Sequence, residues 1–140
     1  MAVKRILRYL AGTKTLGITY RASQDEDNEN LFHGFSDAAF ANQDDGKSTS
    51  GYVFLASGGA ITWKSKKQSI IALSSTESEY VALSEAGREA SWLRNLYGKL
   101  GFTQTKPTII LGDNEGSVSM THNPQFHARS KHIALWHHWV

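Results

Sequence analysis

The sequence lacks several residue types and patterns, and each absence narrows the possible functions. Among its 140 residues there is no cysteine, so disulfides, thiolate zinc sites and a cysteine nucleophile are excluded. No run of about 18 or more apolar residues occurs either, so no membrane-spanning helix is expected. The basic N-terminal stretch, MAVKRILRYLAGT, has no continuous apolar region of the kind found in signal peptides. These absences favour an intracellular protein.

The excess of positive over negative charge is also small. The formal net charge of +2 argues only weakly for an anionic partner, and the arrangement of the charges matters more than their sum. Hydrophobic residues make up 40% of the chain, which is enough apolar material for a core. The length is that of one domain.

The longest predicted helix, residues 74–99, organises the rest of the chain. Ser74 and Glu77 have the spacing of a capping box, in which a hydroxyl and a carboxylate satisfy amides at the start of a helix. Apolar or small residues then recur at helical spacing, and the same stripe extends back to Glu79. A carboxylate on the buried side of a helix is costly unless a cation neutralises it. Glu79 is therefore either a side chain that reaches solvent at the rim of the core or a metal ligand. The stripe comprises Ala82, Ala86, Ala90, Leu93 and Tyr97.

The order of the remaining elements predicts the fold class. Three β-prone runs precede the long helix, and an apolar run and a second helix follow it. This order predicts an α/β fold, with an antiparallel three-strand meander and a parallel strand brought in by the crossover helix. The expected elements are a helix at 2–10, a β-prone run at 17–21, an acidic loop at 24–30, strands at 31–35, 51–56, 60–66 and 107–111, and a helix at 114–120.

Two aspartates follow apolar strands. Asp37 and Asp113 are each expected at the C-terminal end of a strand, the edge of an open α/β sheet where ligands bind. If these strands are adjacent and parallel, both carboxylates lie close to Glu79 in the first turn of the crossover helix. Three carboxylates repel one another unless a cation neutralises them, and oxygen-only ligands favour Mg²⁺ or Mn²⁺. Taken singly, an aspartate at a strand end is more often a turn or cap residue.

Four segments of the sequence resemble one protein family. They are SDAAFANQDDGKSTSGYVFLASGGAITWKSKKQ, ALSSTESEYVALSEA, LGDNEGSV and NPQFHARSKHI, in that order. Together they are similar to the ribonuclease H domain of copia-type retrotransposon Pol polyproteins, and the resemblance covers nearly the whole chain. Residues 1–14, which contain RYLAGT, resemble the end of the reverse transcriptase connection segment, and residues 15–140 resemble the ribonuclease H domain.

The resemblance implies a ribonuclease H fold and metal-dependent hydrolysis of the RNA strand of RNA:DNA hybrids. Asp37, Glu79 and Asp113 match three of the four catalytic, metal-binding acids of the family, and the implied cofactor is Mg²⁺ or Mn²⁺. The implied partners are an RNA:DNA hybrid and the reverse transcriptase portion of the same polyprotein. The implied location is the cytoplasm, the nucleus or a virus-like particle.

The chain departs from the family pattern at several positions. Ala39 and Phe40 replace an aspartate and a tryptophan, and Ala134 replaces the aspartate of a KHID motif. No aspartate or glutamate follows Glu115, so the fourth catalytic acid is absent, and we expect the final strand and helix to be missing. A chain truncated in this way is expected to be a weak or inactive nuclease. The alternative is a catalytically dead remnant that binds hybrids or has a structural role.

Basic residues could contact phosphates, although a run such as KSKK also occurs on solvated strand edges that resist aggregation. Trp63 could stack on a sugar or belong to the core. Among the histidines of the C-terminal tail, the resemblance places His127 in a loop near the active site, where it could help product release. A zinc site built from His127, His132 and His137 is the rival, but their spacing keeps them off one helical face. The candidate phosphate contacts are Lys64, Lys66, Lys67 and Arg88, with Arg94 as a further possibility.

Overall fold

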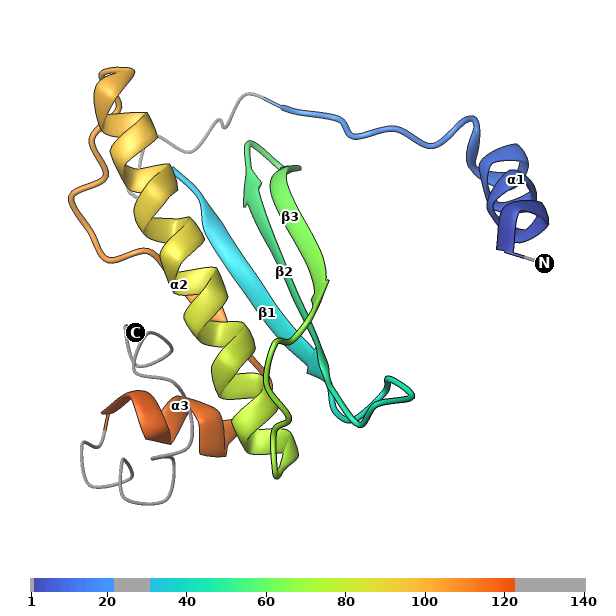
Figure 1. The fold of residues 1–140 in the computed structure, drawn as a ribbon. Coiled ribbons are helices and arrows are strands. Elements are labelled where there is room, and N and C mark those ends of the chain that lie inside the picture. Colours follow the sequence, from blue (N-terminus) through green and yellow to red (C-terminus); the bar gives the residue numbers. More distant parts are fainter. Residues whose placement is uncertain (1, 22–30, 123–140) are drawn as a thin grey trace.

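A computed structural model describes residues 2–21 and 31–122 of the chain (Figure 1). The segment at 24–30, the C-terminal tail with His127, and any final strand or helix beyond residue 122 lie outside the described residues. The elements are α1 (Ala2–Thr13), β1 (His33–Ala39), β2 (Thr49–Ala56), β3 (Gly59–Lys67), α2 (Ser75–Lys99), β4 (Ile110–Leu111) and α3 (Glu115–His122).

The strands form one mixed sheet in the order β3-β2-β1-β4. The pairs β1–β2 and β2–β3 are antiparallel, whereas β4 lies parallel to β1 after the crossover through α2. The predicted α/β class, the meander and the parallel strand are therefore confirmed. No helix in the described residues is long and apolar enough to cross a membrane.

The core lies between the sheet and α2, which runs diagonally across it (Figure 1). Ala86 and Ala90 of α2 pack with Phe54 of β2 and with Phe32, which precedes β1. Because the helix presents alanines here, its backbone can approach the sheet closely. The predicted stripe is confirmed: Ala82, Ala86, Ala90 and Leu93 are buried, and Tyr97 is partly buried against the core.

The structure corrects the sequence prediction at several elements. The run at 17–21 forms no strand. Its Arg21 amide donates a hydrogen bond to the Ser57 carbonyl in the β2–β3 turn (2.8 Å), but no ladder of strand pairs continues from this contact. The strand predicted at 107–111 is reduced to the two residues of β4. Trp63 is 62% exposed, so the core alternative for it is wrong.

The first helix, α1, extends slightly beyond the predicted range and ends at Thr13. It contacts none of the other helices and strands that the structure describes. Its apolar residues remain exposed, including Val3 (70%) and Leu7 (61%). The helix therefore contributes nothing to the core.

Candidate metal centre

The start of α2 is fixed by its capping residues. Ser74 is the N-cap, and its Oγ accepts a hydrogen bond from the Glu77 amide at 3.2 Å. The Glu77 carboxylate in turn accepts from the amide of Leu73, at 2.7 Å. A capping box is thus confirmed, although its second hydrogen bond goes to the residue before the N-cap. This use of Glu77 leaves Glu79, at the start of the second turn rather than in the first turn as predicted, as the carboxylate that faces the sheet.

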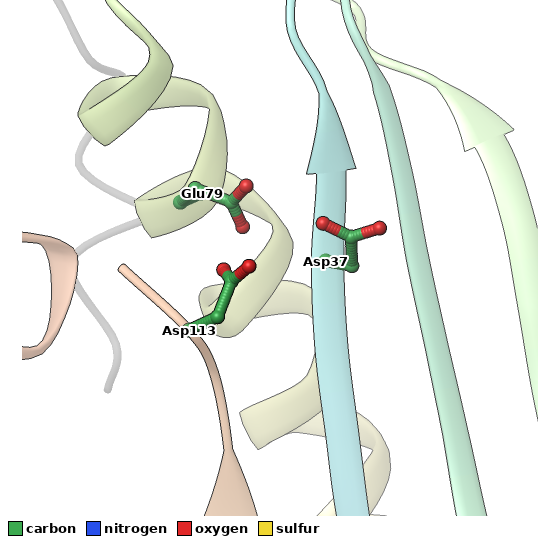
Figure 2. A group of neighbouring side chains, drawn as sticks. All are labelled: Asp37, Glu79 and Asp113. Carbon is green, nitrogen blue, oxygen red and sulfur yellow. The ribbon is translucent and has the colours of Figure 1, made fainter. Parts of the chain in front are cut away.

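Three carboxylates converge beside this helix start (Figure 2). Asp37, Glu79 and Asp113 each offer an oxygen, and these atoms all lie within 4.8 Å of one another. The predicted convergence is therefore confirmed. We refer to these three residues as the carboxylate cluster.

The strand register explains why the two aspartates meet. Phe35 of β1 is paired with Leu111 of β4, and the aspartates lie two positions further along the two parallel chains. Asp37 is inside β1, two residues before its end, rather than after the strand as the sequence predicted. The ladder extends this far because Ala39 still pairs with Thr49 of β2.

The short helix α3 holds Asp113 from the other side. Asn114 accepts a hydrogen bond from the Ser117 amide through its side chain (2.9 Å), which caps α3 directly after Asp113. Gly116 lets α3 approach the first turn of α2, because a Cβ at this position would lie only 3.0 Å from Thr76 Cγ2. The first turns of α2 and α3 therefore lie together, close to the C-terminal ends of β1 and β4.

The environment of the cluster favours a proton or a cation on Glu79. Glu79 is only 9% exposed, whereas both aspartates are exposed. Burial raises the pKa of Glu79, and the neighbouring charges of Asp37 and Asp113 raise it further. A hydrogen bond from the Ala38 backbone amide partly opposes this shift. Three acidic groups this close together are most stable when something positive lies between them.

The geometry of the cluster fits a small divalent cation. Mg²⁺ binds oxygen at about 2.1 Å, so ligands on opposite sides of the ion are about 4.2 Å apart. The upper limit of 4.8 Å between the oxygens is slightly larger, and a small side-chain movement would close the difference. All three donors are carboxylate oxygens, the ligand type that Mg²⁺ and Mn²⁺ prefer. The cluster could therefore hold such an ion.

The predicted phosphate contacts lie elsewhere, around one pocket between β3 and α2. Two of them form ion pairs: Lys64 with Glu85 (3.4 Å) and Lys67 with Asp45 (2.8 Å). Arg94 does not join them. Instead it donates to the carbonyls of the segment after α2, where it has a structural role. The four cations around the pocket are Lys64, Lys66, Lys67 and Arg88.

The sequence did not indicate the rest of this pocket, which is lined in addition by Tyr52, Ser69, Glu85 and Glu89. The spacing of Glu85 and Glu89, four residues apart, was the only available signal, because residues at i and i+4 share a helix face. That signal does not distinguish a pocket from a solvated surface.

Comparison with known proteins finds similarity to retrotransposon Pol polyproteins and to one secreted effector. It is 41% identical over 140 residues to the retrovirus-related Pol polyprotein from transposon TNT 1-94 of Nicotiana tabacum, covering 99% of this chain and 10% of that protein. The match to the Pol polyprotein from transposon RE1 of Arabidopsis thaliana is also 41%, over 99% of this chain and 9% of that protein. The secreted RxLR effector protein 161 of Plasmopara viticola is 50% identical over 94 residues, which are 66% of this chain and 63% of the effector. No protein-family model matches the chain.

The chain is thus similar to retrotransposon Pol polyproteins over almost all its residues, which supports a retroelement origin. It spans about a tenth of the length of the Pol polyproteins it matches. The resemblance seen in the sequence is therefore confirmed at the level of the polyprotein.

Proposed function

We propose that the chain is a ribonuclease H-like domain that hydrolyses the RNA strand of RNA:DNA hybrids. The observation that carries this proposal is the convergence of Asp37, Glu79 and Asp113 from two neighbouring parallel strands and the crossover helix. The mixed α/β sheet and the similarity to retrotransposon Pol polyproteins support it.

The chemistry requires water to add across a P–O3′ bond, leaving a 5′-phosphate and a 3′-hydroxyl. When bound, Mg²⁺ or Mn²⁺ would activate the attacking water and stabilise the charge on the leaving oxygen. The carboxylate cluster supplies the oxygen ligands and the negative charge that hold such an ion. Lys64, Lys66, Lys67 and Arg88 would contact the phosphates of the bound hybrid.

The proposed activity of this chain is weak. Three carboxylates can hold one Mg²⁺, because this ion keeps several of its waters. Among the described residues the cluster has three acids, so a second ion would find less negative charge there. Losing one member of a catalytic unit commonly lowers the rate by several orders of magnitude. A catalytically dead remnant that binds hybrids without cleaving them is therefore the second candidate.

We also propose that residues 1–14 are the end of a reverse transcriptase connection segment. The exposed apolar residues of α1, and its lack of contact with the other described elements, support its packing against another part of the polyprotein. The partner inferred here is the reverse transcriptase portion of that polyprotein.

The test is a cleavage assay on an end-labelled RNA:DNA hybrid with Mg²⁺ or Mn²⁺. We expect slow cleavage by the parent chain that Asp113→Asn abolishes, whereas Asp44→Asn, which changes an exposed aspartate on the β1–β2 loop, should have no effect. Cleavage that survives Asp113→Asn would show that the cluster is not the active site. Hybrid binding without any cleavage would favour the second candidate.

A further inference from the structure

A group of buried polar residues joins the start of α2 to the sheet. Its members are Ser48, Ser50, Gln68 and Ser78, and none of them is more than 2% exposed. The core further along α2 is built from apolar side chains instead. Burying polar groups is costly unless they form hydrogen bonds, so the hydrogen bonds of this group decide what it contributes.

Gln68 is the centre of the group. It follows β3 directly, and its backbone amide donates to the Ser48 carbonyl (2.8 Å), which continues the pairing of β3 with β2 by one residue. Its side-chain Nε2 donates to Ser50 Oγ on β2 (2.9 Å) and to the Ser78 carbonyl on α2 (3.0 Å). Because a carbonyl can only accept, the nitrogen of the side-chain amide must face α2. Gln68 thus bridges the sheet and the helix through one amide group.

Both ends of this bridge lie next to members of the carboxylate cluster. The Ser78 carbonyl belongs to the peptide unit that also contains the Glu79 nitrogen. Ser50 pairs with Ala38, which follows Asp37 in β1. The Ala38 amide in turn donates a hydrogen bond to the Glu79 carboxylate. The contacts therefore form a closed ring, which runs from Glu79 through the bridge and β1 back to Glu79.

The oxygen of the Gln68 side-chain amide indicates that stability alone does not explain this residue. This atom, Oε1, is buried, and none of the residues that the structure describes donates a hydrogen bond to it. Such an acceptor lowers stability, because it gives up its hydrogen bonds to water on folding. An apolar side chain of the same length, such as methionine, would avoid that cost. Polar groups that are kept at a cost to stability are expected at functional sites.

We propose that Gln68 is a positioning residue for the carboxylate cluster: its amide fixes the Glu79 backbone relative to Asp37, so that the three carboxylates are positioned for a divalent cation. This inference rests on the proposed function, in which the cluster binds such an ion. Removing a partner that orients a metal ligand typically lowers metal affinity by roughly 10- to 100-fold. Gln68 acts on its ligand through the main chain, so we expect an effect at the lower end of that range.

The experiment measures the affinity for Mn²⁺ from the electron paramagnetic resonance of the free ion, without nucleic acid. Gln68→Met keeps the length of the side chain and removes both donors, and it should weaken Mn²⁺ binding about tenfold. Its thermal unfolding in EDTA should stay within about 4 °C of the parent's, because the lost hydrogen bonds are offset by removal of the unpaired Oε1. A purely structural role predicts the opposite pattern, with a lower melting temperature and unchanged affinity, and that result overturns the proposal.

Gln104→Met is the matched control. Gln104 is another buried glutamine, and its Nε2 donates to Thr108 Oγ1 (3.0 Å) in the segment after α2, beyond the end of the helix that is remote from Glu79. This substitution should leave the affinity for Mn²⁺ unchanged. An equal loss of affinity in Gln104→Met and Gln68→Met overturns the proposal.

Ser50→Ala removes only the sheet end of the bridge, and it tests the proposal even if Gln68→Met does not fold. Alone it should weaken Mn²⁺ binding by less than Gln68→Met does, and binding as tight as the parent's overturns the proposal. The double variant should bind Mn²⁺ no more weakly than Gln68→Met, because substitutions within one hydrogen-bond network are not additive. Losses of affinity that multiply would mean that the two residues act independently, which also overturns the proposal.

Glu79→Gln separates this proposal from the proposed function. Weaker Mn²⁺ binding by Glu79→Gln, together with unchanged binding by Gln68→Met, overturns only the positioning role of Gln68. Unchanged binding by Glu79→Gln means that the cluster is not the metal site, and both proposals then fail. Because no hybrid is present, an absence of cleavage activity leaves the result intact.

Discussion

Replacing Glu79 by glutamine removes one of three mutually repelling charges and keeps the shape of the side chain. Glu79 forms two of the three like-charge pairs in the cluster, with oxygens within 4.8 Å. At that distance two unit charges repel by about 1 kcal/mol in the dielectric of water, which is the appropriate limit because both aspartates are exposed. Without metal at neutral pH, Glu79→Gln should therefore raise the free energy of unfolding by about 2 kcal/mol.

The pH dependence of this gain follows from the raised pKa of Glu79. A raised pKa in the folded state means that protonated Glu79 stabilises the fold. That contribution is complete below the ordinary value of 4.5 and is lost as the pH rises through the higher folded value. The stability difference between Glu79→Gln and the parent should therefore be largest at neutral pH and shrink as the pH approaches 4.5.

Metal should reverse the order of stability. Mg²⁺ at about 100 times its dissociation constant stabilises a binding protein by about 2.7 kcal/mol. The parent chain should gain this amount, and Glu79→Gln, which has lost one charged ligand, should gain much less.

The assay is thermal unfolding followed by circular dichroism in EDTA and in excess Mg²⁺, with Asp44→Asn as the charge-matched control. Two results together would refute the idea that the cluster repels itself and binds a cation. Glu79→Gln would be less stable than the parent in EDTA, and Mg²⁺ would raise the stability of the parent and of Glu79→Gln equally.

Three further substitutions test the packing. Gly34→Ala would place a Cβ 2.4 Å from Phe54 Cε1 and should cost about 1–3 kcal/mol in urea unfolding. Gly51→Ala, whose Cβ would meet nothing closer than 3.7 Å, is its control, and equal costs would count against the contact. Ala86→Glu buries an unpaired charge under α2 and should abolish cooperative thermal unfolding, so a transition near the parent's would argue against this core. Arg94→Lys loses the planar fork that binds two carbonyls and should speed amide exchange in the segment after α2; unchanged exchange would contradict that role.

The sequence predicted the features that depend on local signals and on connection rules. The start of α2 was predictable because Ser74 and Glu77 form the cap within one turn. The convergence of the cluster was predictable because a three-strand meander followed by a crossover helix leaves the next strand parallel to the first, which brings Asp37 and Asp113 to one edge. Both arguments need only residue spacing and the handedness of a common motif.

The features that the sequence did not predict depend on burial. Glu85 lies on a helix in which polar residues are frequent, and only the packing of α2 over β1 and β2 buries it. In the apolar run at 107–111, the Ile109 carbonyl accepts from the Gly34 amide (2.9 Å) and only Ile110 and Leu111 form the strand, whereas the Thr108 side chain accepts from Arg94. Such choices between alternative partners are made by the tertiary structure.

Two buried acidic residues lie on one helix, and this fixes the spacing between them. Glu79 and Glu85 are six positions apart on α2, which corresponds to about 9 Å along the helix axis. An α-helix of this length transmits displacement as a rigid body, so a shift of α2 relative to the sheet moves both carboxylates together. The height of α2 above the sheet is set by Ala86 and Ala90, where a larger side chain would push the helix outward. The small residues of the core therefore set how far the Glu79 carboxylate lies from the two aspartates on the sheet side of the cluster.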